Sequence, residues 1–136
     1  MDLDQARSFL RDHHRAVLAT TRRDGTPQLS PVLAGLDGEG RATVSTRETA
    51  MKTHNARRDP RVWLCVLSDG FHGDWIQVEG TASVLSLPEA MEPLVEYYRR
   101  VSGEHPDWDD YRRAMVRYRR VLLRIELTRA GPDRGG

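Results

Sequence analysis

The sequence lacks the features that mark several large classes of protein. It has a single cysteine, Cys65, so it cannot form an intrachain disulfide, and a reducing compartment is expected. No apolar run is long enough to span a membrane, and the N-terminal segment MDLDQARSFLRDHHR lacks the apolar core of a secretory signal. We therefore expect a cytoplasmic protein that does not enter a membrane.

An excess of either charge is also absent. The 21 Lys and Arg residues against 20 Asp and Glu residues give a net charge of +1, which does not favour a nucleic-acid partner. No Cys-x-x-Cys, His-x-x-x-His or carboxylate cluster indicates a metal site. No order of Ser, His, Asp or Cys indicates a catalytic group, so a catalytic residue is not identified. The remaining composition is that of an ordinary globular protein.

Short stretches of strand-forming residues, separated by turn signals, predict six strands. Asp24-Gly25 is typical of a hairpin turn, Pro31 indicates an edge or a bulge, and Glu79-Gly80 indicates a second bulge. Hairpin connections of this kind favour a small antiparallel barrel over a parallel sheet. The predicted strands are 15–23, 27–36, 41–46, 61–69, 74–86 and 120–128.

Four helices are expected around these strands, which makes the fold mainly β with flanking helices. Leu3 and Leu10 lie on the apolar face of the first. The second covers about residues 49–58, with Thr49 as its N-cap. The third follows a capping box at 86–89, and the fourth lies near 108–118. We expect one cofactor-binding domain over residues 1–130 and a disordered tail at 131–136.

The segment STRETAMKTHNARRDPRV concentrates positive charge around the second helix. Between Arg47 and Arg61 it has five Lys or Arg residues and two acids. Lys52 falls in the first turn, where backbone N–H groups and the helix dipole already attract anions. Asn55 adds an amide donor one turn later. These residues predict a phosphate or carboxylate site, although a solvated charged face explains the same pattern.

Several segments together resemble a known family. GTPQLSPV, then STRETAMKTHNARRDPRV, then a Trp-bearing strand ending in VEGTA are similar to the split β-barrel proteins that bind flavins and deazaflavins, the superfamily of the pyridoxamine 5′-phosphate oxidases. SGEHPDWDDYRRAMVRYRRVLL resembles the actinobacterial branch that uses the deazaflavin coenzyme F420. The resemblance implies a six-stranded antiparallel split β-barrel, also called the FMN-binding split barrel. It further implies a homodimer with the cofactor in a groove between subunits.

The resemblance also implies roles for particular residues. In the family, a K-x-x-N element binds the phosphate-bearing tail of the cofactor, which matches Lys52 and Asn55 here. An aromatic residue of the partner subunit closes the groove, which matches Trp75. Ala56 stands where relatives often have Leu, and a cation that some relatives carry near residue 50 is missing. The remaining implied cofactor-binding residues are Gln28, Ser30, Pro31, Ser45 and Thr46 around the ring system, and Arg47 and Arg58 as further cations.

The activity implied by the resemblance is an F420-dependent reduction. Reduced deazaflavin would transfer a hydride to an electron-poor C=C or C=N bond of a small molecule. Two alternatives keep the same fold: an oxidoreductase that binds FMN, and a non-catalytic protein that stores or carries F420. No segment resembles the substrate-binding C-terminus of the vitamin B6 oxidases, so oxidation of pyridoxamine phosphate is not expected.

Overall fold

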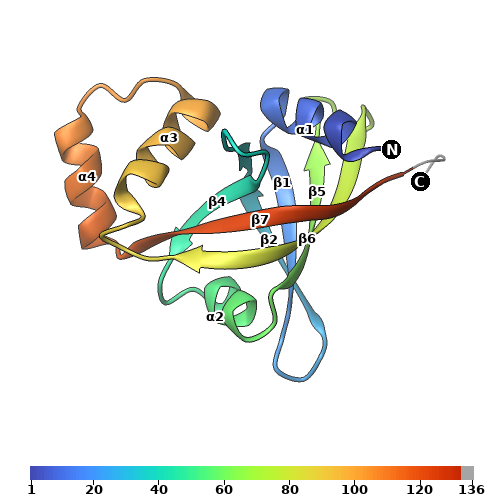
Figure 1. The fold of residues 1–136 in the computed structure, drawn as a ribbon, viewed down its shortest axis with the longest axis horizontal. Helices are drawn as coiled ribbons and strands as arrows, with labels where there is room; N and C mark the ends of the chain where they lie inside the picture. The colour runs from blue at the N-terminus through green and yellow to red at the C-terminus, as the bar shows by residue number, and fades with distance from the viewer. Residues whose placement is uncertain (133–136) are drawn as a thin grey trace.

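The computed structural model describes residues 1–132, in which seven strands form one antiparallel sheet in the order β2-β1-β5-β6-β7-β4-β3 (Figure 1). The sheet curls into a half-barrel. Residues 133–136, most of the predicted tail, lie outside the described residues, whereas Gly131 ends the last strand. The strands are β1 (Arg15–Thr21), β2 (Pro27–Leu33), β3 (Gly35–Leu36), β4 (Ala42–Arg47), β5 (Arg61–Leu67), β6 (Trp75–Leu85) and β7 (Arg120–Gly131).

The prediction of six strands is wrong because the predicted strand 27–36 is divided at Ala34. The first part, β2, pairs with β1, and the second part, β3, pairs with β4 on the opposite side of the sheet. Ala34 is fully buried, and its backbone N–H donates to the carbonyl oxygen of His14 at 2.7 Å. The chain thus changes partner within one residue, which brings the two ends of the sheet together.

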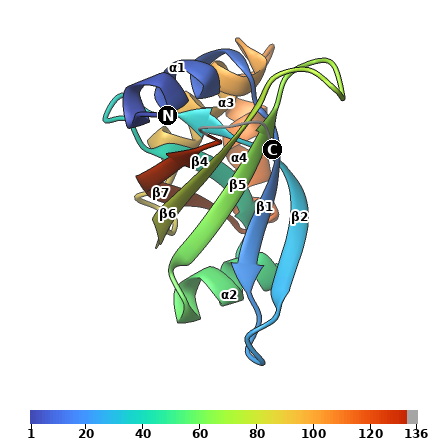
Figure 2. The ribbon, with the colours of Figure 1, turned by 90° about the vertical axis from the view of Figure 1, so that its right-hand side faces the viewer.

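Two strand edges remain open where the half-barrel is split. Among the described residues, β2 pairs only with β1, and the end of β4 at 45–47 pairs only with β7. Open edges present backbone N–H and C=O groups to any neighbour. The helix α2 (Met51–Arg58) leaves the end of β4 and lies below β1 and β5 (Figure 2). Apart from Trp75, all the residues predicted to bind the cofactor lie on β2, β4 or α2.

The other helices lie at the far end and at the side of the sheet (Figure 1). Helix α1 (Leu3–Asp12) has a capping box formed by Asp2 and Gln5. Helices α3 (Met91–Ser102) and α4 (Trp108–Arg117) form a lobe beside β4 and β7. No helix in the described part of the chain is long and apolar enough to cross a membrane.

Two predicted helix starts differ from the observed ones. Ala50 caps α2 without a side-chain hydrogen bond, so Thr49 is not the N-cap. Residues 86–90 form a turn in which the backbone N–H of Ala90 donates to the carbonyl of Ser86, and α3 begins only at Met91. The capping-box prediction is therefore wrong. The side chain of Ser86 instead accepts a hydrogen bond from Arg57 at 3.1 Å.

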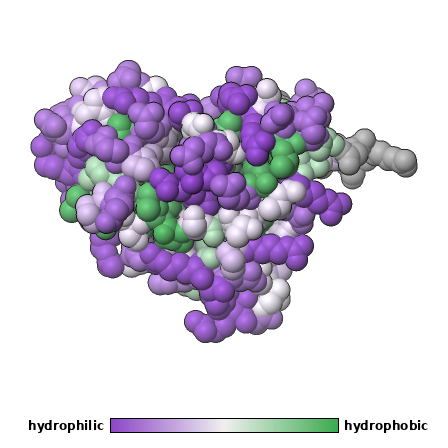
Figure 3. Space-filling model, in the orientation of Figure 1, coloured by the Kyte–Doolittle hydropathy of each residue, from purple (hydrophilic) through white to green (hydrophobic). Residues whose placement is uncertain are grey.

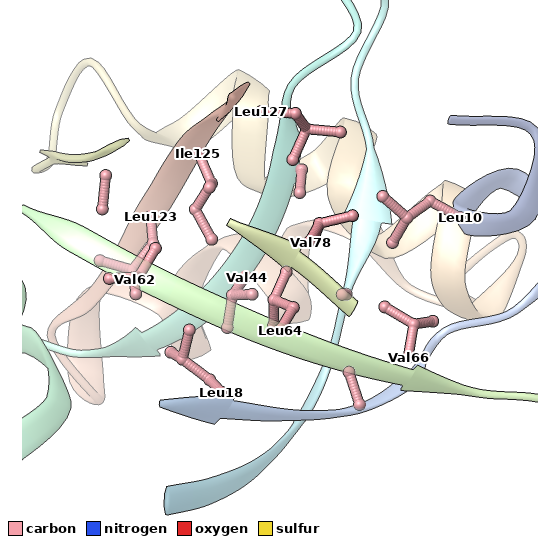
Figure 4. Close-up of a cluster of buried hydrophobic side chains, with 14 of the residues drawn as sticks. Leu10, Leu18, Val44, Val62, Leu64, Val66, Val78, Leu123, Ile125 and Leu127 are labelled. Carbon is pink, nitrogen blue, oxygen red and sulfur yellow. The ribbon is translucent and has the colours of Figure 1, made fainter. Parts of the chain in front are cut away.

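Alternate residues of the strands fill the inside of the half-barrel. Figure 4 shows Leu18, Val44, Leu64 and Ile125 meeting there from four different strands, and all are at most 1% exposed. Each fully buried side chain of this kind contributes roughly 1.5–3 kcal/mol. Buried residues alternate regularly with less buried ones in β1 and β5, because each strand turns one face to the core.

The predicted bulge at Glu79-Gly80 is confirmed by a shift in the β6–β7 register at these residues. A Cβ atom at Gly80 would collide with the side chain of Ile125 and would lie 2.5 Å from the backbone oxygen of Glu126. Only glycine lets β7 approach this closely. The bulge bends β6 and contributes to the curl of the sheet.

Candidate functional site

The open edges of β2 and β4 and the α3–α4 lobe border a hollow of about 500 Å³, which we call the cleft. This volume lies within the range of about 300–1,000 Å³ that is usual for small-molecule sites. Pro31, Ser45 and Lys52 are predicted site residues in its wall.

Lys52 is the only lysine of the chain, and it shares the cleft with Arg120 of β7. Burial lowers the pKa of the Lys52 ammonium, and the charge of Arg120 lowers it further. Within residues 1–132, neither side chain forms an ion pair with a carboxylate. Two neighbouring cations without a counter-ion destabilise each other, and an anion bound between them removes that penalty.

Further cations stand at the rim of the cleft around Tyr118. Arg47 and Arg120 are directly opposite each other in the β4–β7 ladder. The guanidinium of Arg47 lies 5.4 Å from the centre of the Tyr118 ring, and that of Arg117 lies 5.0 Å from it. This arrangement extends the positive charge from Lys52 to the surface. It suits a ligand that carries more than one negative charge.

Two tyrosines form the wall of the cleft on the side of the helical lobe. The Tyr97 hydroxyl donates to the carbonyl oxygen of Leu33 at 2.8 Å, and the Tyr111 hydroxyl donates to that of Leu94 at 2.9 Å. Burial raises the pKa of Tyr111 to about 12. Both phenols are therefore neutral, and each hydroxyl already donates to a backbone carbonyl. They form apolar walls of the cleft rather than proton donors.

A second hollow, of about 880 Å³, lies on another side of α2 and is bordered by Gln28, Asn55 and Arg58. The β1–β2 hairpin adds Arg22 and Arg23, which the sequence analysis did not single out. The sequence feature that could have indicated these two cations is their position directly before the predicted hairpin turn at Asp24-Gly25. Figure 3 shows a hydrophilic surface at this end of the molecule.

Asn55 connects α2 to β1 and β2 and is only 1% exposed. Its amide nitrogen donates to Oγ1 of Thr20 at 3.1 Å and to Oε1 of Gln28 at 3.2 Å, and its oxygen accepts from Arg58. Arg58 also donates to the carbonyl of Thr21. The groups of Asn55 are thus used within the protein, where they hold Gln28 and Arg58 in place.

Two other predicted residues are buried beneath the cleft. Ser30 is 8% exposed and Thr46 is 1% exposed. The Thr53 hydroxyl of α2 donates to the backbone oxygen of Arg47 at 2.6 Å and lies 3.4 Å from Oγ1 of Thr46. Thr53 was not among the predicted site residues, and its hydroxyl holds the start of α2 against the open edge of β4.

Trp75 does not reach the cleft of its own chain. It lies at the start of β6, is 37% exposed, and borders a separate hollow with Gln77 and Arg129. The resemblance assigns the tryptophan to the groove of the partner subunit, and a single chain does not test that assignment. The role of Trp75 stays a prediction.

Comparisons with known proteins identify sequences and structures that resemble this chain. A family model described as pyridoxamine 5′-phosphate oxidase matches residues 3–131. An F420H2-dependent biliverdin reductase of Mycobacterium tuberculosis is 30% identical over 128 residues, which cover 93% of this chain and 84% of that protein.

Solved structures share the fold. A conserved hypothetical protein of Mycobacterium tuberculosis has a TM-score of 0.77 and 28% identity, over 96% of this chain and 82% of that one. A structure described as an F420 reductase has a TM-score of 0.71 and 22% identity, over 91% of this chain and 94% of that one. At the latter identity the likeness concerns the fold alone. With its curled antiparallel sheet and its family match, the chain belongs to the pyridoxamine 5′-phosphate oxidase family and is a distant homologue of an F420H2-dependent reductase.

Proposed function

We propose that this protein is an F420-dependent oxidoreductase that acts on a small molecule. When bound, reduced F420 supplies the hydride, which passes to an electron-poor C=C or C=N bond of the substrate. The observation that carries this proposal is the pair Lys52 and Arg120, two cations in one cleft without a carboxylate partner among the described residues. The homology with an F420H2-dependent reductase supports it.

The residues of the cleft fit such a cofactor. Lys52 and Arg120 are suited to hold its phosphate, and Arg47 at the rim is suited to hold the carboxylates that follow. The open edges of β2 and β4 offer backbone groups to a polar ring system, in particular an acceptor carbonyl at Pro31, which has no N–H, and the backbone of Ser45. Gln28 and Thr46 contact α2 through Asn55 and Thr53, which holds β2 and β4 against this helix.

The protein supplies position and exclusion of water rather than a reactive group. Tyr97 and Tyr111 close one side of the cleft with neutral, hydrogen-bonded phenols. No proton donor is assigned to the cleft, so solvent is the proposed source of the proton that follows the hydride.

We also propose a homodimer. The outward face of β2 carries Pro27, Leu29, Pro31 and Leu33, and Leu29 and Leu33 are 66% and 43% exposed. A solvent-exposed strand rarely presents an unbroken row of apolar side chains, so we expect a partner subunit to cover this row of β2. A second copy would bury this row and would bring its Trp75 to the cleft.

The test is turnover. Purified protein is mixed with reduced F420 and a panel of conjugated enones, imines and quinones, and the absorbance of oxidised F420 is followed. We expect oxidation that needs both protein and acceptor. Tight binding without turnover of any acceptor would favour a carrier of F420, and activity with FMN alone would favour the FMN enzyme.

A further inference from the structure

A second pocket lies farther along the face of the sheet that carries the cleft. In the β4–β7 ladder, Arg47 is opposite Arg120 and Thr43 is opposite Arg124. Side chains two residues apart share a face of a strand, so Thr43 and Arg124 lie on the face of the cleft cations. Thr43 and Arg124 border a pocket of about 180 Å³, which we call the β4–β7 pocket, and Tyr97 borders both hollows.

Two polar atoms at the floor of this pocket have no hydrogen-bond partner. They are Oγ1 of Thr43, a residue only 2% exposed, and Nε of the half-buried Arg124. Buried polar groups are nearly always paired in folded proteins, so two neighbouring exceptions call for a ligand or an ordered water. Their position on paired strands places them together.

The charges around the pocket leave two guanidiniums without a counter-ion. Arg41 is engaged by Asp37 at 2.8 Å and by Glu39 at 3.3 Å. Glu96, a third acid of the wall, pairs with Arg99 at 3.0 Å. The other cations of the wall are Arg100 and Arg124, and neither forms an ion pair within the described residues.

We propose that the β4–β7 pocket binds a small oxyanion, either a carboxylate or a phosphate. The guanidiniums of Arg100 and Arg124 would receive its oxygens, and a rotation of the Thr43 side chain would let its hydroxyl donate to the same group. The volume of about 180 Å³ admits such an anion but not a nucleotide or a flavin. The site is separate from the proposed cofactor cleft, because among the described residues only Tyr97 borders both hollows.

The experiment is an NMR titration of the full chain without F420, at constant ionic strength set with sodium chloride. Inorganic phosphate and acetate are added separately, and the backbone amides of Thr43 and Arg124 and the Nε–H of Arg124 are followed. We expect saturable shifts of these signals. The anion with the higher affinity shows whether the pocket prefers a phosphate or a carboxylate. Shifts at Ser45 and Lys52 alone would place the anion in the cleft and overturn the proposal.

Three variants make the result specific. Arg124→Met should weaken the affinity about tenfold or more, as expected when a hydrogen bond to a charged group is lost. Thr43→Val keeps the shape of the residue in the strand, preserves folding, and should also weaken binding. Arg113→Met, at an exposed arginine of α4 that borders neither hollow, should bind as the parent does. Equal affinity in the parent and Arg124→Met would mean an adventitious ion only, and absence of any saturable shift would mean that water alone fills the pocket.

Discussion

The amide of Asn55 donates to the side chain of Gln28 at 3.2 Å and so joins α2 to β2 next to the split of the half-barrel. Asn55 follows Lys52 by three residues, yet the two side chains have different surroundings. Lys52 is half-buried in the cleft without a carboxylate partner among the described residues, whereas Asn55 is buried and fully hydrogen-bonded. We therefore expect substitutions of Lys52 to change cofactor affinity and substitutions of Asn55 to change the stability of the fold.

The first prediction concerns Lys52→Ala. Cofactor affinity should fall by about 1.5–3 kcal/mol, the usual range for a hydrogen bond to a charged group. The unfolding midpoint in urea should not fall below that of the parent, because the replaced ammonium has no counter-ion among the described residues and is repelled by Arg120. Fluorescence titration with F420 at low salt measures the affinity, and Arg99→Ala on α3 is the matched control. An unchanged affinity would place the anion elsewhere.

Asn55→Ala should act mainly on stability. It leaves Thr20 and Gln28 without their common donor in a buried place, which costs about 1–3 kcal/mol. Urea denaturation followed by tryptophan fluorescence measures the loss. If the variant is as stable as the parent but binds F420 poorly, then Asn55 contacts the cofactor directly and the supporting role is wrong.

The pH dependence of binding follows from the lowered pKa of Lys52, whose ordinary value is 10.5. A bound phosphate favours the charged ammonium and so raises this pKa, and the complex takes up a proton in the window between the two values. Affinity should therefore decline as the pH rises through the lowered pKa of the free protein. Lys52→Arg keeps its charge at every accessible pH, so it should bind without this alkaline decline. A parent affinity that stays constant up to pH 10.5 would contradict the assignment.

A substitution in the apolar row on β2 tests whether the protein is a dimer. The parent should sediment as a dimer at micromolar concentration, and Leu29→Asp should sediment as a monomer. Leu29 is 66% exposed in the single chain and does not border the cleft, so the variant should keep its circular dichroism spectrum. It should lose cofactor affinity if the partner completes the groove. A monomeric parent that binds F420 tightly would remove both the dimer and the role of Trp75.

Much of the sheet could be predicted because its signals are local. Asp24-Gly25 forms the expected turn, with Gly25 at φ 88°, and the bulge at Gly80 follows from a glycine inside a strand pattern. The division at Ala34 has no local signal, since it depends on which distant strand each half meets. The same reason explains why Arg120 was not among the predicted cofactor-binding residues: the β4–β7 ladder, not sequence proximity, brings it to the cleft with Lys52.

The most direct test of the central claim compares F420 with FMN on the same protein. FMN ends at one phosphate, whereas F420 continues into lactate and several glutamates, which the rim cations around Tyr118 are placed to meet. We expect F420 to bind at least about tenfold more tightly, equivalent to about 1.4 kcal/mol. Part of this preference should fade with added salt, because the outer contacts are exposed and screened.

The same titration gives a second readout, the stability of the reduced cofactor in air. Reduced deazaflavin reacts poorly with oxygen, so reduced F420 on this protein should persist until an acceptor is added. Equal or tighter binding of FMN, with a yellow protein that consumes oxygen once reduced, would contradict the account and establish the FMN enzyme in its place.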